Sequence, residues 1–136
     1  MKTFSAQRPF RCDFESLGDY HDFWVKVQSC APDDLTYSFL EEPVDQVQAL
    51  VDAFDSLHGG LTLAKKKLKD EHRYRIAEEL LRMAYDFYSS GARKQGIACL
   101  QEAEGLIWPS QSIKPNFVAE AERRAFGKAT LFADVK

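Results

Sequence analysis

The sequence predicts an all-α protein, a small bundle or short solenoid of about five to six helices stacked as helical hairpins, with a short extended N-terminal segment. Two observations carry this prediction. Apolar residues recur at helical spacing over most of the chain, and no proline interrupts the stretch between Pro43 and Pro109. With 136 residues, 45% of them hydrophobic and 29% charged, the chain is long enough to form a domain with its own core.

The N-terminal third is expected to contain an extended segment and one helix. Apolar residues alternate with polar ones over residues 10–14, as in a strand. Over residues 20–31 they recur at helical spacing, and Asp19 can serve as the N-cap of that helix. The pattern of residues 35–40 fits a strand and a helix, so both alternatives stay open.

A continuous apolar stripe predicts the next helix, which begins at Pro43. The stripe consists of Val44, Val47, Leu50, Val51, Phe54 and Leu57. We expect this helix to end at Gly59 and Gly60, because a glycine after the last apolar position can adopt the left-handed conformation that terminates helices. An amphipathic segment with a run of lysines follows, and residues 62–90 can form one helix or two.

Residues 77–109 are expected to fold as two amphipathic helices joined by a turn at Gly91. Glu78 and Arg82 are spaced for an i,i+4 ion pair on the first helix. Small residues would let the two helix axes approach closely: Ala84, Gly96 and Ala103.

The remaining chain predicts one more helix after Pro115, ending near Gly127. Residues 128–136 are expected to be a loose tail. The whole chain, residues 1–136, is thus predicted to be a single helical domain.

The hairpin over residues 77–109 resembles one tetratricopeptide repeat. The large, small and aromatic positions of the family pattern are occupied, by size class, by Leu80, Met83, Ala84, Phe87, Gly96, Leu100 and Ala103. The resemblance implies a protein that holds a partner. Because a solenoid needs about three repeats and no second clean copy follows from the sequence, a degenerate repeat protein and an unrelated helical bundle with a tight hairpin both remain open.

The resemblance also implies which side chains would contact a partner. On the groove side of the first helix these are Glu78, Leu81, Tyr85, Tyr88 and Ser89. Leu81 and Tyr85 stand where carboxylate-clamping members of the family carry lysine and asparagine, so the implied contact is apolar and aromatic. The alternative is that Leu81 and Tyr88 belong to the core.

Charge is distributed unevenly along the chain. Residues 1–60 carry four basic and eleven acidic side chains, whereas residues 61–136 carry fourteen basic and ten acidic ones. Acidic residues gather around the prolines that precede the long helix: Asp33, Asp34, Glu41, Glu42 and Asp45. Such a cluster can steer a basic partner, which makes it a second candidate binding surface. The alternative is a solvated region whose acids lie favourably near helix N-termini.

The sequence indicates no catalytic residues, no metal site and no cofactor. His21, His58 and His72 lie in no metal-ligand spacing, and the three cysteines form no CxxC pair. The usual motifs of nucleotide binding and of nucleophilic hydrolysis are missing from the sequence. A nucleic-acid partner is disfavoured, because acidic residues interrupt the lysine run and the net charge is −3.

These observations lead to the hypothesis of a cytoplasmic, non-catalytic binding protein. We expect an inhibitor or immunity-type protein that neutralises a basic protein partner, such as a bacterial toxin. No membrane span and no signal peptide are expected. The alternatives are an adaptor or chaperone that holds an apolar peptide on the hairpin, and an enzyme with an unrecognised site near His21 or His72. The sequence does not predict the oligomeric state.

Overall fold

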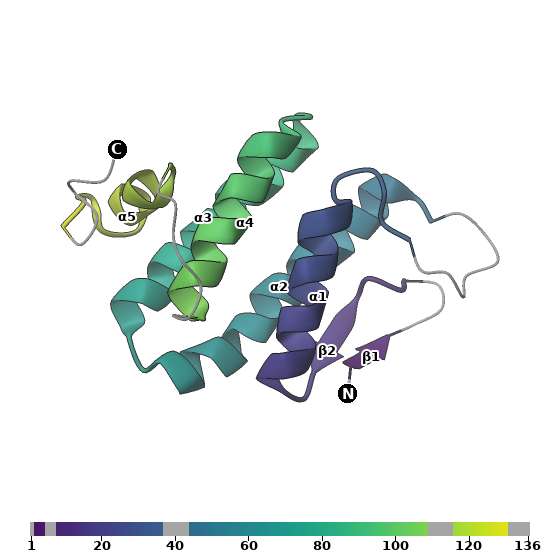
Figure 1. The fold of residues 1–136 in the computed structure, drawn as a ribbon, viewed down its shortest axis with the longest axis horizontal. Coiled ribbons are helices and arrows are strands. Elements are labelled where there is room, and N and C mark those ends of the chain that lie inside the picture. The colour runs from purple at the N-terminus through teal and green to yellow at the C-terminus, as the bar shows by residue number, and fades with distance from the viewer. Residues whose placement is uncertain (1, 5–7, 37–43, 109–115, 131–136) are drawn as a thin grey trace. The chain divides into compact units, whose positions relative to one another are not determined.

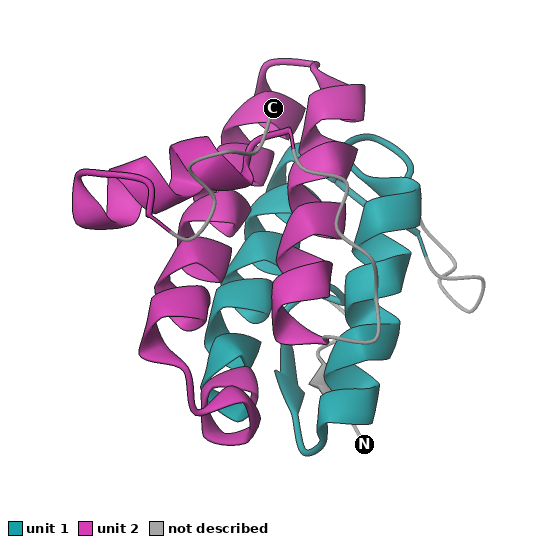
Figure 2. Ribbon diagram, turned by 60° about the vertical axis from the view of Figure 1, so that its left-hand side comes forward, with its two compact units in different colours: residues 1–63 teal, residues 64–136 magenta. Residues whose placement is uncertain are grey.

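The computed structural model describes residues 2–4, 8–36, 44–108 and 116–130 (Figure 1). Within these ranges the chain forms five helices and one two-stranded sheet, which confirms the predicted all-α class. The chain divides into two compact units, residues 1–63 (unit 1) and residues 64–136 (unit 2), as Figure 2 shows. The single domain expected from the sequence therefore remains a prediction.

Unit 1 contains two strands, one helix and most of a second: β1 (Lys2–Phe4), β2 (Cys12–Phe14), α1 (Leu17–Cys30) and α2 (Gln46–Leu68). The strands pair antiparallel, with Phe4 opposite Cys12, and β2 confirms the extended N-terminal segment. The N-cap of α1 is Ser16, whose hydroxyl accepts the N–H of Asp19 at 3.1 Å. The prediction of Asp19 as the cap was wrong because the helix begins earlier, at Leu17.

Helix α2 continues through Gly59 and Gly60, so the prediction that it ends at these glycines is wrong. It ends at Leu68, and the next residue, Lys69, takes a left-handed backbone conformation with φ of 53°. That conformation terminates helices because it turns the chain out of the helical path. Residues 62–90 therefore belong to two helices.

Contact with α1 explains why α2 carries glycine at position 60. A Cβ atom built on Gly60 would lie 2.3 Å from the Tyr20 ring, which is closer than two carbon atoms can approach. Tyr20 is fully buried, and its hydroxyl donates to the carbonyl of Leu57 at 2.5 Å. Gly60 thus marks a close helix contact and not a helix end.

A buried polar network joins the N-terminal segment to α2. The N–H of Cys12 donates to the Ser56 hydroxyl at 2.8 Å, and that hydroxyl donates to the carbonyl of Phe10 at 2.7 Å. The ring of Phe14 lies with its centroid 5.3 Å from that of Tyr20, which extends the same contact to α1. One serine therefore satisfies backbone groups that burial would otherwise leave without partners.

Two ion pairs strengthen this attachment. Arg8 pairs with the buried Asp52, its Nε donating at 3.1 Å, and Arg11 pairs with the exposed Asp55 at 2.8 Å. Burial on its own raises the pKa of Asp52, but the hydrogen bonds from Arg8 and Gln48 outweigh it and hold this pKa below its ordinary value. Asp52 therefore stays ionised in the interior of unit 1.

Unit 2 contains the end of α2 and three further helices: α3 (Glu71–Ser89), α4 (Arg93–Ile107) and α5 (Val118–Phe126). α3 and α4 lie side by side as the predicted hairpin (Figure 1), with Gly91 in a left-handed conformation (φ 85°) at the turn. α5 ends at Gly127 (φ 80°), as the sequence predicted. Pro109 and residues 131–136 lie outside the described ranges.

The two helices of the hairpin approach closely at Gly96. A Cβ atom built there would lie 2.8 Å from the ring of Tyr88, and the neighbouring Ala84 and Ala103 are fully buried. The predicted close approach through small residues is confirmed. The predicted pair on the first helix also forms, with Arg82 3.3 Å from Glu78.

Two buried glutamates attach α5 to the hairpin. Glu102 of α4 accepts the N–H groups of residues 116–118 at 2.8, 2.8 and 2.9 Å, which caps the start of α5. Glu122 of α5 lies 2.5 Å from the His72 ring and accepts the N–H of Thr130 at 2.9 Å. Thr130 lies in the segment predicted to be a loose tail, and its hydrogen bond to Glu122 anchors it to α5.

Candidate protein-binding surface

A side-chain clamp joins the segment after α1 to the start of α2. The amide of Gln46 accepts the N–H of Leu35 at 2.7 Å and donates to the carbonyl of Leu35 at 2.8 Å. Leu35 is fully buried, so the clamp is anchored in the core of unit 1. Because Asp34 and Asp45 are the sequence neighbours of the two clamped residues, the clamp brings the backbone of these two aspartates into the same part of unit 1.

We define the acidic patch as the exposed side chains of Asp33, Asp34, Asp45 and Val47. Asp33 and Asp34 make no side-chain hydrogen bond or ion pair within the described ranges. Asp45 is the N-cap of α2, since its carboxylate accepts the N–H groups of Val47 at 3.0 Å and Gln48 at 3.2 Å. Three of the five acidic residues selected from the sequence are thus exposed in unit 1, and Glu41 and Glu42 lie outside the described residues.

Val47 is 78% exposed beside these carboxylates. Val47 belongs to the apolar stripe that predicted this helix, yet its side chain is exposed in the first turn of α2. An apolar residue at this position fits the helical period whether its side chain is buried or exposed. Spacing alone therefore does not predict the exposure of Val47. An exposed aliphatic side chain amid carboxylates can supply apolar contact area to a partner.

The charge of unit 1 remains largely unbalanced inside the unit. Its 63 residues contain the same four basic and eleven acidic side chains as residues 1–60. Arg8 and Arg11, two of those four basic residues, are already paired with Asp52 and Asp55. Unit 1 by itself therefore carries a net negative charge, which attracts cationic partners.

The hairpin face selected from the family resemblance has a different character. Leu81 is fully buried and Tyr88 is 2% exposed, so both belong to the core of unit 2, the alternative that the sequence left open. Burial also raises the pKa of Tyr88, which keeps its phenol neutral. Glu78 pairs with Arg82, and Tyr85 is half-buried, so these residues form no continuous apolar surface.

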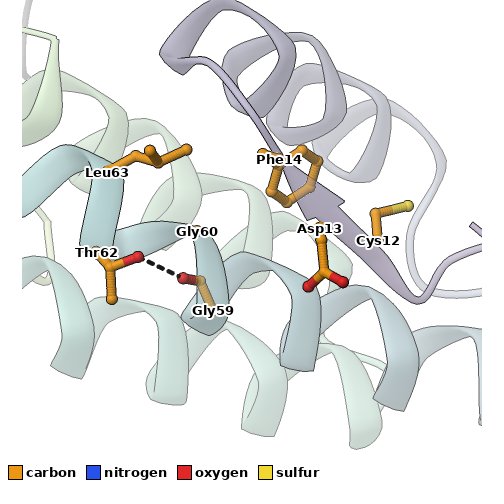
Figure 3. A pocket seen from close by; sticks show the side chains of 7 residues that line it. All are labelled: Cys12, Asp13, Phe14, Gly59, Gly60, Thr62 and Leu63. Carbon is orange, nitrogen blue, oxygen red and sulfur yellow. Dashed lines mark hydrogen bonds between the residues drawn. The ribbon is translucent and has the colours of Figure 1, made fainter. Parts of the chain in front are cut away.

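Unit 1 also contains a small hollow between β2 and α2, with a volume of about 170 Å³ (Figure 3). It is lined by Cys12, Asp13, Phe14, Gly59, Gly60, Thr62 and Leu63. The sequence did not indicate this hollow, because the two elements that form it are more than forty residues apart.

His72 and Cys99 have structural surroundings. His72 stacks on Phe126 with 4.1 Å between ring centroids and pairs with Glu122, so it serves to attach α5. Burial and the neighbouring carboxylate of Glu102 raise the pKa of the Cys99 thiol to about 12, which suppresses thiolate chemistry. Within the described ranges, no group of three or more His, Cys, Asp and Glu side chains is arranged to hold a metal ion.

Comparisons of the chain with protein-family models, curated proteins and solved structures find no match. The likeness of the α3–α4 hairpin to a tetratricopeptide repeat therefore remains a resemblance of sequence pattern. Among the helices in the described part of the chain, none combines the length and apolar character needed to cross a bilayer.

Proposed function

We propose that the protein is a non-catalytic, cytoplasmic binding protein of the inhibitor or immunity type, which neutralises a basic protein partner. The observation that carries the proposal is the acidic patch, in which the Gln46 clamp holds the backbone next to Asp34 and Asp45, and the carboxylates of Asp33 and Asp34 make no ion pair within the described ranges. A partner with a basic surface supplies the missing positive charge. A toxin whose active surface is basic is one such partner.

The patch provides both steering and contact. Unscreened carboxylates raise the rate at which a cationic partner is captured, since the negative field concentrates it near the surface. Val47, 78% exposed, can be covered by the partner once docked. Because the clamp already orders the backbone, little ordering entropy remains to be lost on binding at this site.

The proposal is tested first by identifying the partner. The full chain is used to capture proteins from the cells that produce it, and bound material is identified by mass spectrometry. We expect a basic protein that is released near 1 M salt, where the Debye length falls to about 3 Å. Recovery of nucleic acid, or of an acidic protein held in high salt, contradicts the proposal.

The role of the patch is tested by the association rate of the recovered protein. In the variant Asp33→Asn/Asp34→Asn this rate is expected to fall roughly threefold to tenfold at low salt, with a weaker salt dependence. The matched control, Asp22→Asn/Asp86→Asn, removes the same charge at two other exposed positions. Equal rates in the two variants would exclude the acidic patch as the docking surface.

A further inference from the structure

Gly59 lies inside α2 without a packing reason for glycine. A Cβ atom built on Gly59 would have no atom within 4 Å, whereas one built on Gly60 would collide with Tyr20. Glycine inside a helix costs about 0.5–1 kcal/mol relative to alanine, through backbone entropy. Gly59 therefore lowers the stability of α2 without relieving a clash.

Gly59 borders the hollow between β2 and α2. Phe14 and Leu63 extend towards each other from the two elements (Figure 3), and both are half-buried. Gly59 is one of the residues that line this space of about 170 Å³, and a Cβ atom built on it would meet no atom within 4 Å. Gly59 thus adds no side chain to the lining of the hollow.

The polar groups that line the hollow differ in whether they already make hydrogen bonds. The Thr62 hydroxyl donates to the carbonyl of Gly59 at 3.1 Å, and the Cys12 thiol donates to the carbonyl of Pro9 at 3.6 Å. The exposed carboxylate of Asp13 makes no hydrogen bond or ion pair within the described ranges. The hollow therefore combines apolar walls with one anionic group that has free acceptor capacity.

This combination fits a side chain with an aliphatic stem and a cationic end. The stem can lie against Phe14 and Leu63 while an ammonium group meets Asp13. The volume of about 170 Å³ is well above the ~10–15 Å³ that a single water needs on the same measure, so the end of a slender side chain can enter the hollow. We infer that the hollow binds a lysine side chain of the basic partner, an inference that rests on the proposed function for the identity of the lysine donor.

The hollow is tested without the partner, by NMR titration of the ¹⁵N-labelled full chain with Nα-acetyl-lysine methylamide. We expect saturable shifts at Asp13, Phe14 and residues 59–63, with a dissociation constant in the millimolar range. The norleucine analogue, which has the same stem and no charge, is expected to cause no saturable shifts there. Shifts that the two compounds cause equally, or lysine shifts spread over other acidic residues, overturn the inference.

Three variants test whether the lysine amide binds in the hollow. Asp13→Asn is expected to weaken binding of the lysine amide about fivefold, and Asp22→Asn, with the same loss of charge at another exposed position, to leave it unchanged. Gly59→Leu is expected to abolish binding by filling the hollow, with an unchanged circular dichroism spectrum showing that α2 is retained. Retained binding in Gly59→Leu, or equal weakening by the two aspartate variants, overturns the inference.

Failure of this titration is distinguishable from failure of the proposed function. If the hollow does not bind the lysine amide, the capture experiment and the Asp33→Asn/Asp34→Asn variant still test the acidic patch. When a basic partner is recovered, Asp13→Asn is expected to raise its dissociation rate more than Asp22→Asn does. Equal dissociation rates contradict a lysine seated in the hollow.

Discussion

The two units use the same packing device and differ in how they satisfy buried polar groups. In unit 1 the ring of Tyr20 covers Gly60, and in unit 2 the ring of Tyr88 covers Gly96. Unit 1 then attaches its N-terminal segment through Ser56 and paired arginines, whereas unit 2 attaches α5 through buried glutamates. Ring-on-glycine contacts thus set the helix spacing in both units, while the charged attachments are particular to each.

The largest effect is expected from removing the cap of α5. Glu102→Ala leaves three backbone N–H groups without their acceptor, and we expect a loss of about 3 kcal/mol in the free energy of unfolding of unit 2. Urea denaturation followed by circular dichroism measures this loss. Glu102→Gln is the matched control, because an amide oxygen can still accept these bonds, and it is expected to lose about 1 kcal/mol. Equal losses would show that the carboxylate does not act as the cap.

The ring-on-glycine contacts are compared by placing a methyl group beneath each ring. Gly60→Ala is expected to destabilise the protein by about 2 kcal/mol, since its Cβ would lie 2.3 Å from Tyr20. Gly96→Ala is expected to cost about 1 kcal/mol, because its Cβ would lie 2.8 Å from Tyr88 and a smaller shift relieves the overlap. Chemical denaturation of the two variants gives the order, and the reverse order would contradict this account.

The attachment in unit 1 is expected to depend on pH through Asp52. Its pKa is lower in the folded protein than in the unfolded chain, so its contribution to stability is present above pH ~4 and is lost as the pH falls through the folded pKa. Arg8→Ala removes the partner and is expected to reduce the acid-side slope of stability against pH. Thermal melts between pH 3 and pH 7 measure both slopes, and parallel curves for the two proteins would exclude this pair as the source.

The smallest effect is expected from Gly59→Ala, and its sign is opposite. The added methyl group meets no atom within 4 Å and replaces glycine inside a helix, so we expect stabilisation by about 0.5–1 kcal/mol. The same denaturation measurement is used as for Gly60→Ala. Destabilisation by Gly59→Ala would mean that the hollow is already filled by neighbouring side chains.

The sequence predicted the elements of the fold better than their attachments. Apolar spacing identified the helices, Gly91 and Gly127 marked turns correctly, and the pair of Glu78 and Arg82 followed from its spacing. Local spacing failed at Gly59 and Gly60, where a glycine pair typical of a helix end lies within a helix, and the contact that requires Gly60 comes from Tyr20 on another element.

The candidate sites were predictable to a lesser extent. Charge alone selected Asp33, Asp34 and Asp45, since acidic clusters are visible in the sequence. The clamp of Gln46 was not predictable, because its partner lies eleven residues away in a segment whose structure the pattern left open. Glu102 has partners fourteen to sixteen residues away, and no periodic pattern connects residues at such separations.

The cap by Glu102 also makes α5 an internal probe of unit 2. A helix of nine residues does not form stably by itself in water, so α5 exists because α3 and α4 hold it. The backbone hydrogens of residues 116–118, held by Glu102, are therefore expected to exchange with solvent only when α5 detaches. Hydrogen exchange at these three positions would report the integrity of unit 2 without any added label.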